Sequence, residues 1–403
     1  MSFASEFNSL ALVELTAFAQ NAKAADVEAA LARSEGVAKR VSLADFAALI
    51  SPAAARPQYL EAMARLSHGL TLKHFGRVIR FFAPLYVSNE CINVCQYCGF
   101  SRDNPILRVT LTVDQVVTEA RYLLGQGFRH ILLVAGEHPH FVSDNYLREC
   151  VARLHPEWPS ISLEVGPLET EQYVSLVSAG AEGLVVYQET YDRGVYDAMH
   201  VSGPKKDFDW RLDTPERAYA AGFKRLGIGA LLGLAPWRHE ALALAAHAAY
   251  LLKKCWMAQL TISAPRLRPA AGEFEPLVNM DDRELVQFVC ALRIAFPEVG
   301  LVLSTRESAK LRDNLVPLGI AMMSAGSHTE PGGYTGQGRE KLHVTKGGRM
   351  LKPELPVIES EGEHATVQFE IADTRSPAEV AARLEQMGYE TVWKDWEGAL
   401  NEA

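Results

Sequence analysis

The feature that most constrains this chain is an alternation of short apolar runs with helical patterns along residues 83–330. Eight runs are rich in Val, Ile and Leu, and each is followed by a segment with apolar residues at helical spacing. Strands that alternate with helices pair in parallel, because each helix carries the chain back to the start of the next strand. The pattern predicts an α/β fold of the TIM-type (β/α)8 barrel class. The eight predicted strands are 85–87, 131–134, 161–165, 184–187, 226–231, 260–262, 301–303 and 320–323.

The segments outside the barrel have patterns of their own. Residues 1–80 show helical spacing without strand signals and predict a helical N-terminal extension, with the barrel at 81–330. Residues 331–366 are polar and rich in Gly, which indicates a loop, a short hairpin or an insertion. Residues 367–403 predict a C-terminal helical segment that packs on the barrel, with a capping box at Ser376 and Glu379.

Three cysteines follow the first predicted strand at the spacing C-x3-C-x2-C. They are Cys91, Cys95 and Cys98, and no other cysteine lies near them in the sequence. Three thiolates at this spacing each ligate one iron of a 4Fe-4S cluster and leave the fourth iron with an open coordination position. A structural zinc site that recruits a distant fourth ligand such as Cys150 is the alternative, although zinc sites usually use two separated pairs.

Polar side chains follow the predicted strands, where a barrel places its chemistry. They include Glu137 after the second strand, Glu164 at the end of the third, Arg306 and Ser308 after the seventh, and Ser324 at the end of the eighth. Each of these residues also has a structural interpretation as a helix cap or an ion-pair partner. For Glu164 the expected ion-pair partner is Arg211, and for Arg306 it is Glu307.

The cysteine spacing, with an aromatic residue before the third cysteine, resembles the radical S-adenosylmethionine (AdoMet) enzymes. From about residue 70 the chain is similar to the tyrosine lyases of thiamine biosynthesis within that superfamily. It is also related to the tryptophan lyases of antibiotic biosynthesis and to the tyrosine lyases of hydrogenase maturation, which carry a second cysteine cluster near the C-terminus; here the last cysteine is Cys290. The sequence motifs that carry this similarity are FAPLYVSN (82–89), RLDTPER (211–217), PRLRP (265–269), STRES (304–308), MSAGSHTEPGGY (323–334) and VWKDW (392–396).

The resemblance implies a 4Fe-4S cluster on the three cysteines with AdoMet as cofactor. It implies that Tyr97 packs near the adenine, that Glu137 accepts from the AdoMet amino group and that Glu164 binds the ribose hydroxyls. For the substrate, it implies that Arg306 clamps the carboxylate, with Ser324 and Ser308 sharing the clamp, and that Tyr86 approaches the amine.

The implied reaction splits the Cα–Cβ bond of L-tyrosine into 2-iminoacetate and p-cresol. Its implied partners are a reductant such as flavodoxin and the thiazole synthase. The formal net charge of -9 argues against a nucleic-acid partner, and no apolar stretch is long enough for a membrane span. The absence of a secretory signal predicts a cytoplasmic location. A lyase that acts on tryptophan and a zinc-stabilised binding scaffold are the alternatives.

Overall fold

The computed structural model describes residues 2–34, 41–350 and 364–393. Eight parallel strands close into a barrel, because β11 at one end of the strand order also pairs with β1 at the other. Each of the eight predicted runs falls on one of these strands, although 161–165 and 226–231 extend one residue beyond theirs, and the (β/α)8 barrel is confirmed. The barrel strands are β1 (Val78–Ser88), β4 (His130–Ala135), β5 (Ser160–Glu164), β6 (Gly183–Glu189), β8 (Arg225–Ala230), β9 (Gln259–Ser263), β10 (Gly300–Leu303) and β11 (Ile320–Ser324).

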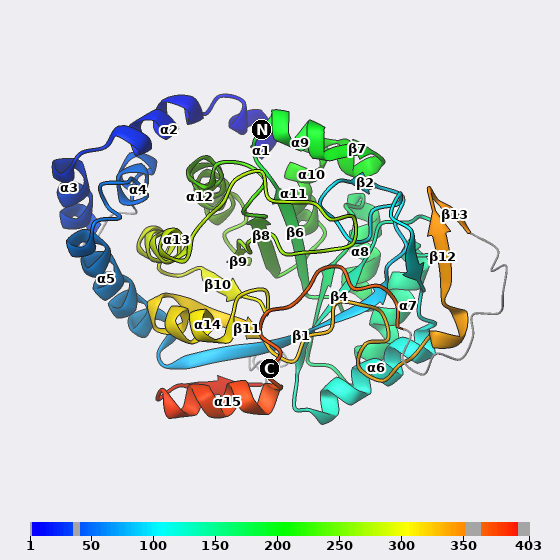
Figure 1. Ribbon diagram of the computed structural model, residues 1–403. Helices are drawn as coiled ribbons and strands as arrows, with labels where there is room; N and C mark the ends of the chain where they lie inside the picture. Colours follow the sequence, from blue (N-terminus) through cyan, green and yellow to red (C-terminus); the bar gives the residue numbers. More distant parts are fainter. Residues whose placement is uncertain (1, 35–40, 351–363, 394–403) are drawn as a thin grey trace.

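Helices surround the barrel and bury their apolar faces against it (Figure 1). Several begin at side-chain caps, and the expected box at Ser376 and Glu379 is present, as is one at Thr112 and Gln115. The helices between and after the strands are α6 (Val113–Gly125), α7 (Asp144–Leu154), α8 (Thr170–Ala179), α9 (Arg193–Met199), α10 (Phe208–Leu212), α11 (Thr214–Ala220), α12 (Trp237–Lys254), α13 (Asp282–Ala295), α14 (Ala309–Leu315) and α15 (Pro377–Gln386).

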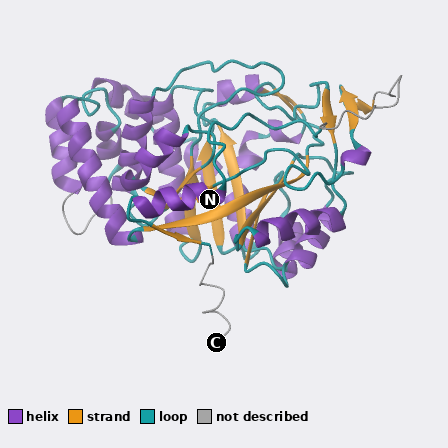
Figure 2. Ribbon diagram, turned by 60° about the horizontal axis from the view of Figure 1, so that its bottom comes forward, coloured by secondary structure: helices purple, strands orange, loops and turns teal. Residues whose placement is uncertain are grey.

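The N-terminal extension is helical, as its spacing predicts, and it packs on α12 and α13 at one side of the barrel (Figure 2). Phe3 anchors its start: the ring is fully buried and stacks on His247 of α12 at 4.2 Å between centroids. No helix in the described part of the chain is both long and apolar enough to cross a membrane. The helices of the extension are α1 (Phe3–Phe7), α2 (Leu12–Asn21), α3 (Ala24–Ser34), α4 (Leu43–Leu49) and α5 (Pro57–Phe75).

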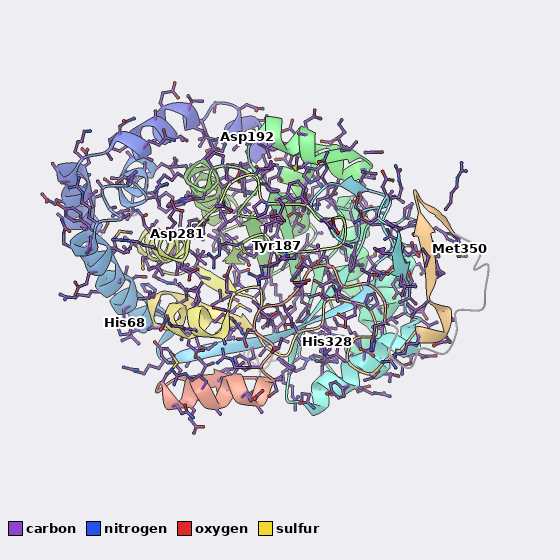
Figure 3. The ribbon with its side chains drawn as sticks, in the orientation of Figure 1. His68, Tyr187, Asp192, Asp281, His328 and Met350 are labelled. Carbon is purple, nitrogen blue, oxygen red and sulfur yellow. The ribbon has the colours of Figure 1, made fainter. Side chains whose placement is uncertain are left out.

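Short strands outside the barrel tie distant segments together. In the polar segment, β12 (His343–Lys346) and β13 (Arg349–Met350) form a hairpin, and β12 pairs antiparallel with β3 (Ile106–Arg108). The tip of this hairpin points away from the barrel, where Figure 3 labels Met350. The C-terminal strand β14 (Glu390–Val392) pairs with the first residues of β1. Trp396, in the motif VWKDW (392–396), lies outside the described residues.

Candidate active site

The loop that carries the three cysteines is held at both ends. Cys95 lies in β2 (Val94–Cys95), which pairs antiparallel with β7 (His200–Ser202). The fully buried Arg108 donates to the carbonyl oxygens of Asn89 at 2.6 Å and Ser101 at 2.7 Å, on either side of the cysteines. Because a buried guanidinium has five donors in a fixed plane, it sets the spacing of the carbonyls that it binds. The loop is thus positioned before any ligand binds.

The three thiols fit a cluster better than a single ion. All three cysteines are free, with Cys95 buried and the other two half-buried. Among the described residues, no three His, Cys, Asp or Glu side chains gather closely enough to hold one metal ion. A tetrahedral zinc requires that closeness, whereas a cubane bonds each thiolate to a different iron. Cys150 lies fully buried on α7 in the apolar core, and the geometry does not support the zinc alternative.

Amide side chains approach two of these sulfurs. Asn93 Nδ2 lies 3.7 Å from Cys91 Sγ and donates to Glu137 Oε2 at 2.7 Å. Gln368 Nε2 lies 4.0 Å from Cys98 Sγ. Hydrogen bonds to the sulfurs stabilise negative charge on a cluster and orient its ligands. Neither amide is an expected site residue, although Asn93 lies inside the cysteine motif.

Tyr97 and Glu137 flank the cysteine loop, as a cofactor site at this end of the barrel requires. The Tyr97 hydroxyl is 2.8 Å from His200 Nε2, and burial raises the pKa of this phenol. The Glu137 carbonyl accepts from Ile92 N at 2.8 Å. Gly166 leaves room for the Glu137 side chain, because an added Cβ there would lie 2.6 Å from it. Both residues therefore lie beside the cysteine loop, and their role toward AdoMet stays a prediction.

Two carboxylates stand at the ends of neighbouring strands. Glu189 on β6 binds Lys205 at 2.6 Å and faces Arg211 at 3.6 Å. Burial opposes its charge, but Lys205 and Arg211 outweigh burial and lower the pKa of Glu189. Arg211 therefore pairs with Glu189 and not with Glu164, which was the expected structural alternative. The Glu189–Lys205 pair went unpredicted, because nothing in the sequence links the two residues.

Glu164, at the end of β5, forms no ion pair among the described residues. Burial and, to a smaller extent, the charge of Glu189 raise its pKa to about 7, although Arg306 and Arg211 act in the opposite direction. The Tyr187 phenol is close enough to feel the charge of Glu164, and Figure 3 places it in the middle of the barrel. A carboxylate in a barrel with a raised pKa and no salt bridge is a candidate for binding a ligand.

Arg306 is also without an acidic partner in the described chain. Its Cζ atom lies 3.4 Å from the centre of the Phe369 ring, so the guanidinium stacks on an aromatic face and keeps its edge for a ligand. Glu307, the expected ion-pair partner, instead binds Arg266, which also binds Asp282. Arg266 is therefore occupied, whereas Arg268 has a buried Nε without a hydrogen-bond partner.

The two serines that were expected beside Arg306 have different positions. Ser324 is buried at the end of β11, and its carbonyl accepts from Arg312, so it lies at the barrel mouth. Ser308 does not: it is exposed, and its Oγ accepts from Leu311 N as the N-cap of α14. That Ser308 shares the carboxylate clamp stays a prediction; its hydroxyl oxygen also caps the start of a helix.

Tyr86 lies near the C-terminal end of β1, as expected. Its side chain is buried, and its hydroxyl donates to Gln368 Oε1 at 2.8 Å. Burial raises the pKa of Tyr86, so the phenol stays protonated. Gln368 was not predicted, because it follows the polar segment at no recognisable spacing from any site residue.

A parallel barrel with three thiols on the loop after its first strand defines the radical SAM class of enzyme. The radical SAM superfamily model matches residues 85–244, and the model of the Biotin and Thiamin Synthesis associated domain matches residues 263–390. The chain is 41% identical to 2-iminoacetate synthase of Escherichia coli (strain K12) over 381 residues, which cover 94% of this chain and 93% of that protein. The same values hold for 2-iminoacetate synthase of Salmonella typhimurium. The chain belongs to the 2-iminoacetate synthase family.

Solved structures agree with this assignment. The chain aligns with a structure of HydG, a maturase of the FeFe-hydrogenase, at a TM-score of 0.85 and 29% identity, covering 97% of this chain and 81% of that one. HydG from Carboxydothermus hydrogenoformans aligns at a TM-score of 0.81 and 31% identity, covering 97% and 83%. Methylornithine synthase (PylB), at 20% identity and a TM-score of 0.69, shares the fold, with 91% of this chain and 97% of that chain covered.

Proposed function

We propose that this enzyme cleaves the Cα–Cβ bond of L-tyrosine to give 2-iminoacetate and p-cresol, with 5'-deoxyadenosine and methionine as co-products, for the thiazole of thiamine. The structural observation that carries the proposal is Arg306, an arginine at the barrel mouth with an aromatic support and no acidic partner in the described chain. A fork of this kind binds a carboxylate through two parallel hydrogen bonds. Membership of the 2-iminoacetate synthase family supports the same reaction.

Cys91, Cys95 and Cys98 would hold the 4Fe-4S cluster, and Tyr97, Glu137 and Glu164 would bind AdoMet. When bound, the cluster and AdoMet supply one-electron cleavage of a carbon–sulfur bond and a carbon radical that removes a hydrogen atom. Glu164 is suited to the ribose hydroxyls because its raised pKa of about 7 and its lack of a salt bridge among the described residues leave its carboxyl group available to hydroxyl groups.

The substrate half of the site would be formed by Arg306, Ser324 and Tyr86. Abstraction of hydrogen from nitrogen requires a neutral amine, and a guanidinium nearby lowers the pKa of an ammonium group. Arg306 therefore fixes the carboxylate and also favours the reactive form of the amine. Tyr86 contacts the amine and orients its remaining hydrogen atoms.

Two partners follow from the chemistry. The reaction consumes electrons, so the enzyme uses a one-electron reductant such as flavodoxin. The product 2-iminoacetate is an imine that water hydrolyses, so an enzyme that consumes it, the thiazole synthase, must receive it quickly. Both partners are part of the proposal.

The proposal is tested by incubating anaerobically reconstituted enzyme with AdoMet, a reductant and L-tyrosine, with L-tryptophan in a parallel reaction. We expect p-cresol and 5'-deoxyadenosine from tyrosine, with glyoxylate as the hydrolysis product of 2-iminoacetate. An indole product from tryptophan without p-cresol would overturn the assignment in favour of the tryptophan lyase. Stoichiometric zinc without iron and sulfide would support the binding scaffold instead.

A further inference from the structure

A segment from the C-terminal part of the chain closes the barrel mouth. Residues 364–373, here called the mouth segment, run across the ends of the barrel strands in Figure 1, coloured orange-red. Their backbone donates to carbonyl groups on several site loops. These bonds are Thr366 N to Leu107 O, Gln368 N to Thr329 O, Glu370 N to Pro269 O and Ala372 N to Thr305 O, each at 2.9 Å. These hydrogen bonds fix the mouth segment to the loops at the barrel mouth.

Gln368 is the residue of this segment that reaches both halves of the site. Its Oε1 accepts from the Tyr86 hydroxyl at 2.8 Å, and its Nε2 points at Cys98 Sγ from 4.0 Å. Its backbone lies against Gly99, where an added Cβ would be 2.4 Å from Gln368 O. Glycine at this position lets the mouth segment approach the cysteine loop.

The two contacts of the amide depend on each other. A thiolate sulfur only accepts hydrogen bonds, so the amide must turn its NH₂ group toward Cys98. The amide oxygen then faces Tyr86 and obliges the phenol to donate to it. With its proton committed to Gln368, the Tyr86 oxygen offers only lone pairs toward the barrel mouth.

We propose that Gln368 is a positioning residue that couples the cluster ligand Cys98 to the direction of the Tyr86 hydroxyl. Through this coupling Tyr86 accepts a hydrogen bond from the substrate amine, which leaves the other N–H directed at the radical. The Tyr86 part of this inference rests on the proposed function, whereas the Cys98 part does not. The N–H group near Cys98 also raises the reduction potential of the cluster, because it stabilises the added negative charge.

Three variants separate the two contacts: Gln368→Leu, Tyr86→Phe and the double variant. Each is measured for iron and sulfide content, for the midpoint potential of the cluster by titration followed by electron paramagnetic resonance, and for p-cresol formed per 5'-deoxyadenosine. We expect Gln368→Leu to lower both the potential and the product ratio, the latter about tenfold, the change that one lost hydrogen bond gives. Tyr86→Phe should lower the ratio and leave the potential unchanged. The double variant should show the ratio of Tyr86→Phe alone, because Gln368 acts on the substrate through Tyr86.

Val367→Ala on the same segment is the matched control, because its exposed side chain contacts neither group, and it should behave as the parent enzyme. Unchanged potential and ratio in Gln368→Leu would overturn the proposal, as would losses that multiply in the double variant. If Gln368→Leu loses iron, Gln368→Asn takes its place, because an amide one methylene shorter cannot span both partners. Failure of the parent enzyme to make p-cresol would refute the proposed function, while the potentials would still test the Cys98 contact.

Discussion

The ends of β5 and β6 each hold a partly buried carboxylate, and the pKa values of the two are shifted in opposite directions. Glu189 on β6 is balanced by Lys205 and Arg211, and its pKa is lowered. Glu164 on β5 has no ion pair among the described residues, and its pKa is raised to about 7. The charge of Glu189 is balanced within the protein. Glu164 has no such ion pair, and we expect a ligand to interact with it.

The loop and helix after β10 repeat the contrast with two arginines. Arg312 is fully buried, binds Asp373 of the mouth segment and donates to Ser324 O. Arg306 is half-buried and stacks on Phe369 without an acidic partner in the described chain. We expect the paired charges at this barrel mouth to hold the structure together and the unpaired ones to bind ligands. Removing the first kind should reduce stability, and removing the second kind should reduce binding.

The largest effect is expected at the cysteines. Here the ligand-binding group is Cys98, with Cys91 and Cys95, and the structural group is Cys290. Changing Cys91, Cys95 or Cys98 to Ala should abolish reductive cleavage of AdoMet, because a cubane that lacks one protein ligand becomes labile. Cys290→Ala should keep the cluster, since that thiol lies fully buried in the apolar core on α13. Iron and sulfide analysis with detection of 5'-deoxyadenosine checks both outcomes. Cluster loss in Cys290→Ala with retention in Cys95→Ala would contradict the assignment.

Glu189→Gln should reduce stability strongly, because it leaves Lys205 and Arg211 buried without their counter-charge. Breaking one side of a buried ion pair costs about 3–5 kcal/mol. The loss should be largest near neutral pH and should shrink as the pH falls through the lowered pKa of Glu189, where the native carboxylate also becomes neutral. Urea unfolding of the protein without cofactors at pH 7 and at acidic pH measures it. Equal stability of variant and parent at pH 7 would show that this pair is not structural.

Glu164→Gln should have the opposite pH dependence. Below the ordinary value of 4.5 the carboxyl group is protonated in both states and contributes nothing. Between 4.5 and about 7 the unfolded chain releases the proton that the folded protein keeps, so stability falls as the pH rises. Above pH 7 the loss is about 3 kcal/mol, and the variant should be more stable than the parent by up to that amount. Urea unfolding at pH 5 and pH 8 decides this; a variant less stable at pH 8 would mean that Glu164 is a paired structural group.

Arg306→Lys should weaken binding without reducing stability. It keeps the charge but loses the planar fork, and a lost charge-assisted hydrogen bond costs about 1.5–3 kcal/mol, or roughly ten- to more than a hundredfold in tyrosine affinity. Cluster content should not change, and slow AdoMet cleavage without p-cresol should remain. Arg312→Lys is the matched control and should instead lower the free energy of unfolding. If Arg306→Lys bound tyrosine normally, Arg268 would be the next candidate, because Arg266 is held by Glu307 and Asp282.

The sequence was sufficient where the information is local. Period and length indicated the eight strands, and the cysteine loop is recognisable because its three thiols lie within eight residues. Partners that fold from distant segments were not predictable. Gln368 and Cys98 are in contact although they lie 270 residues apart in the sequence. Arg211 pairs with Glu189 and not with Glu164, and this depends on how the ends of two adjacent strands are placed. The role of Ser308 as the N-cap of α14 was not predicted, because a position after a strand does not say which hydroxyl caps the next helix.

The position of the mouth segment in the sequence determines when it is synthesised relative to the barrel. Its residues lie near the end of the chain, so all eight barrel strands and the cysteine loop leave the ribosome before Gln368 and Asp373 are made. Until then the three thiols lack their cover from this side, although the barrel strands that carry them are complete. The segment that is made last is therefore the one that lies against the cysteine loop, through Gln368 and Gly99.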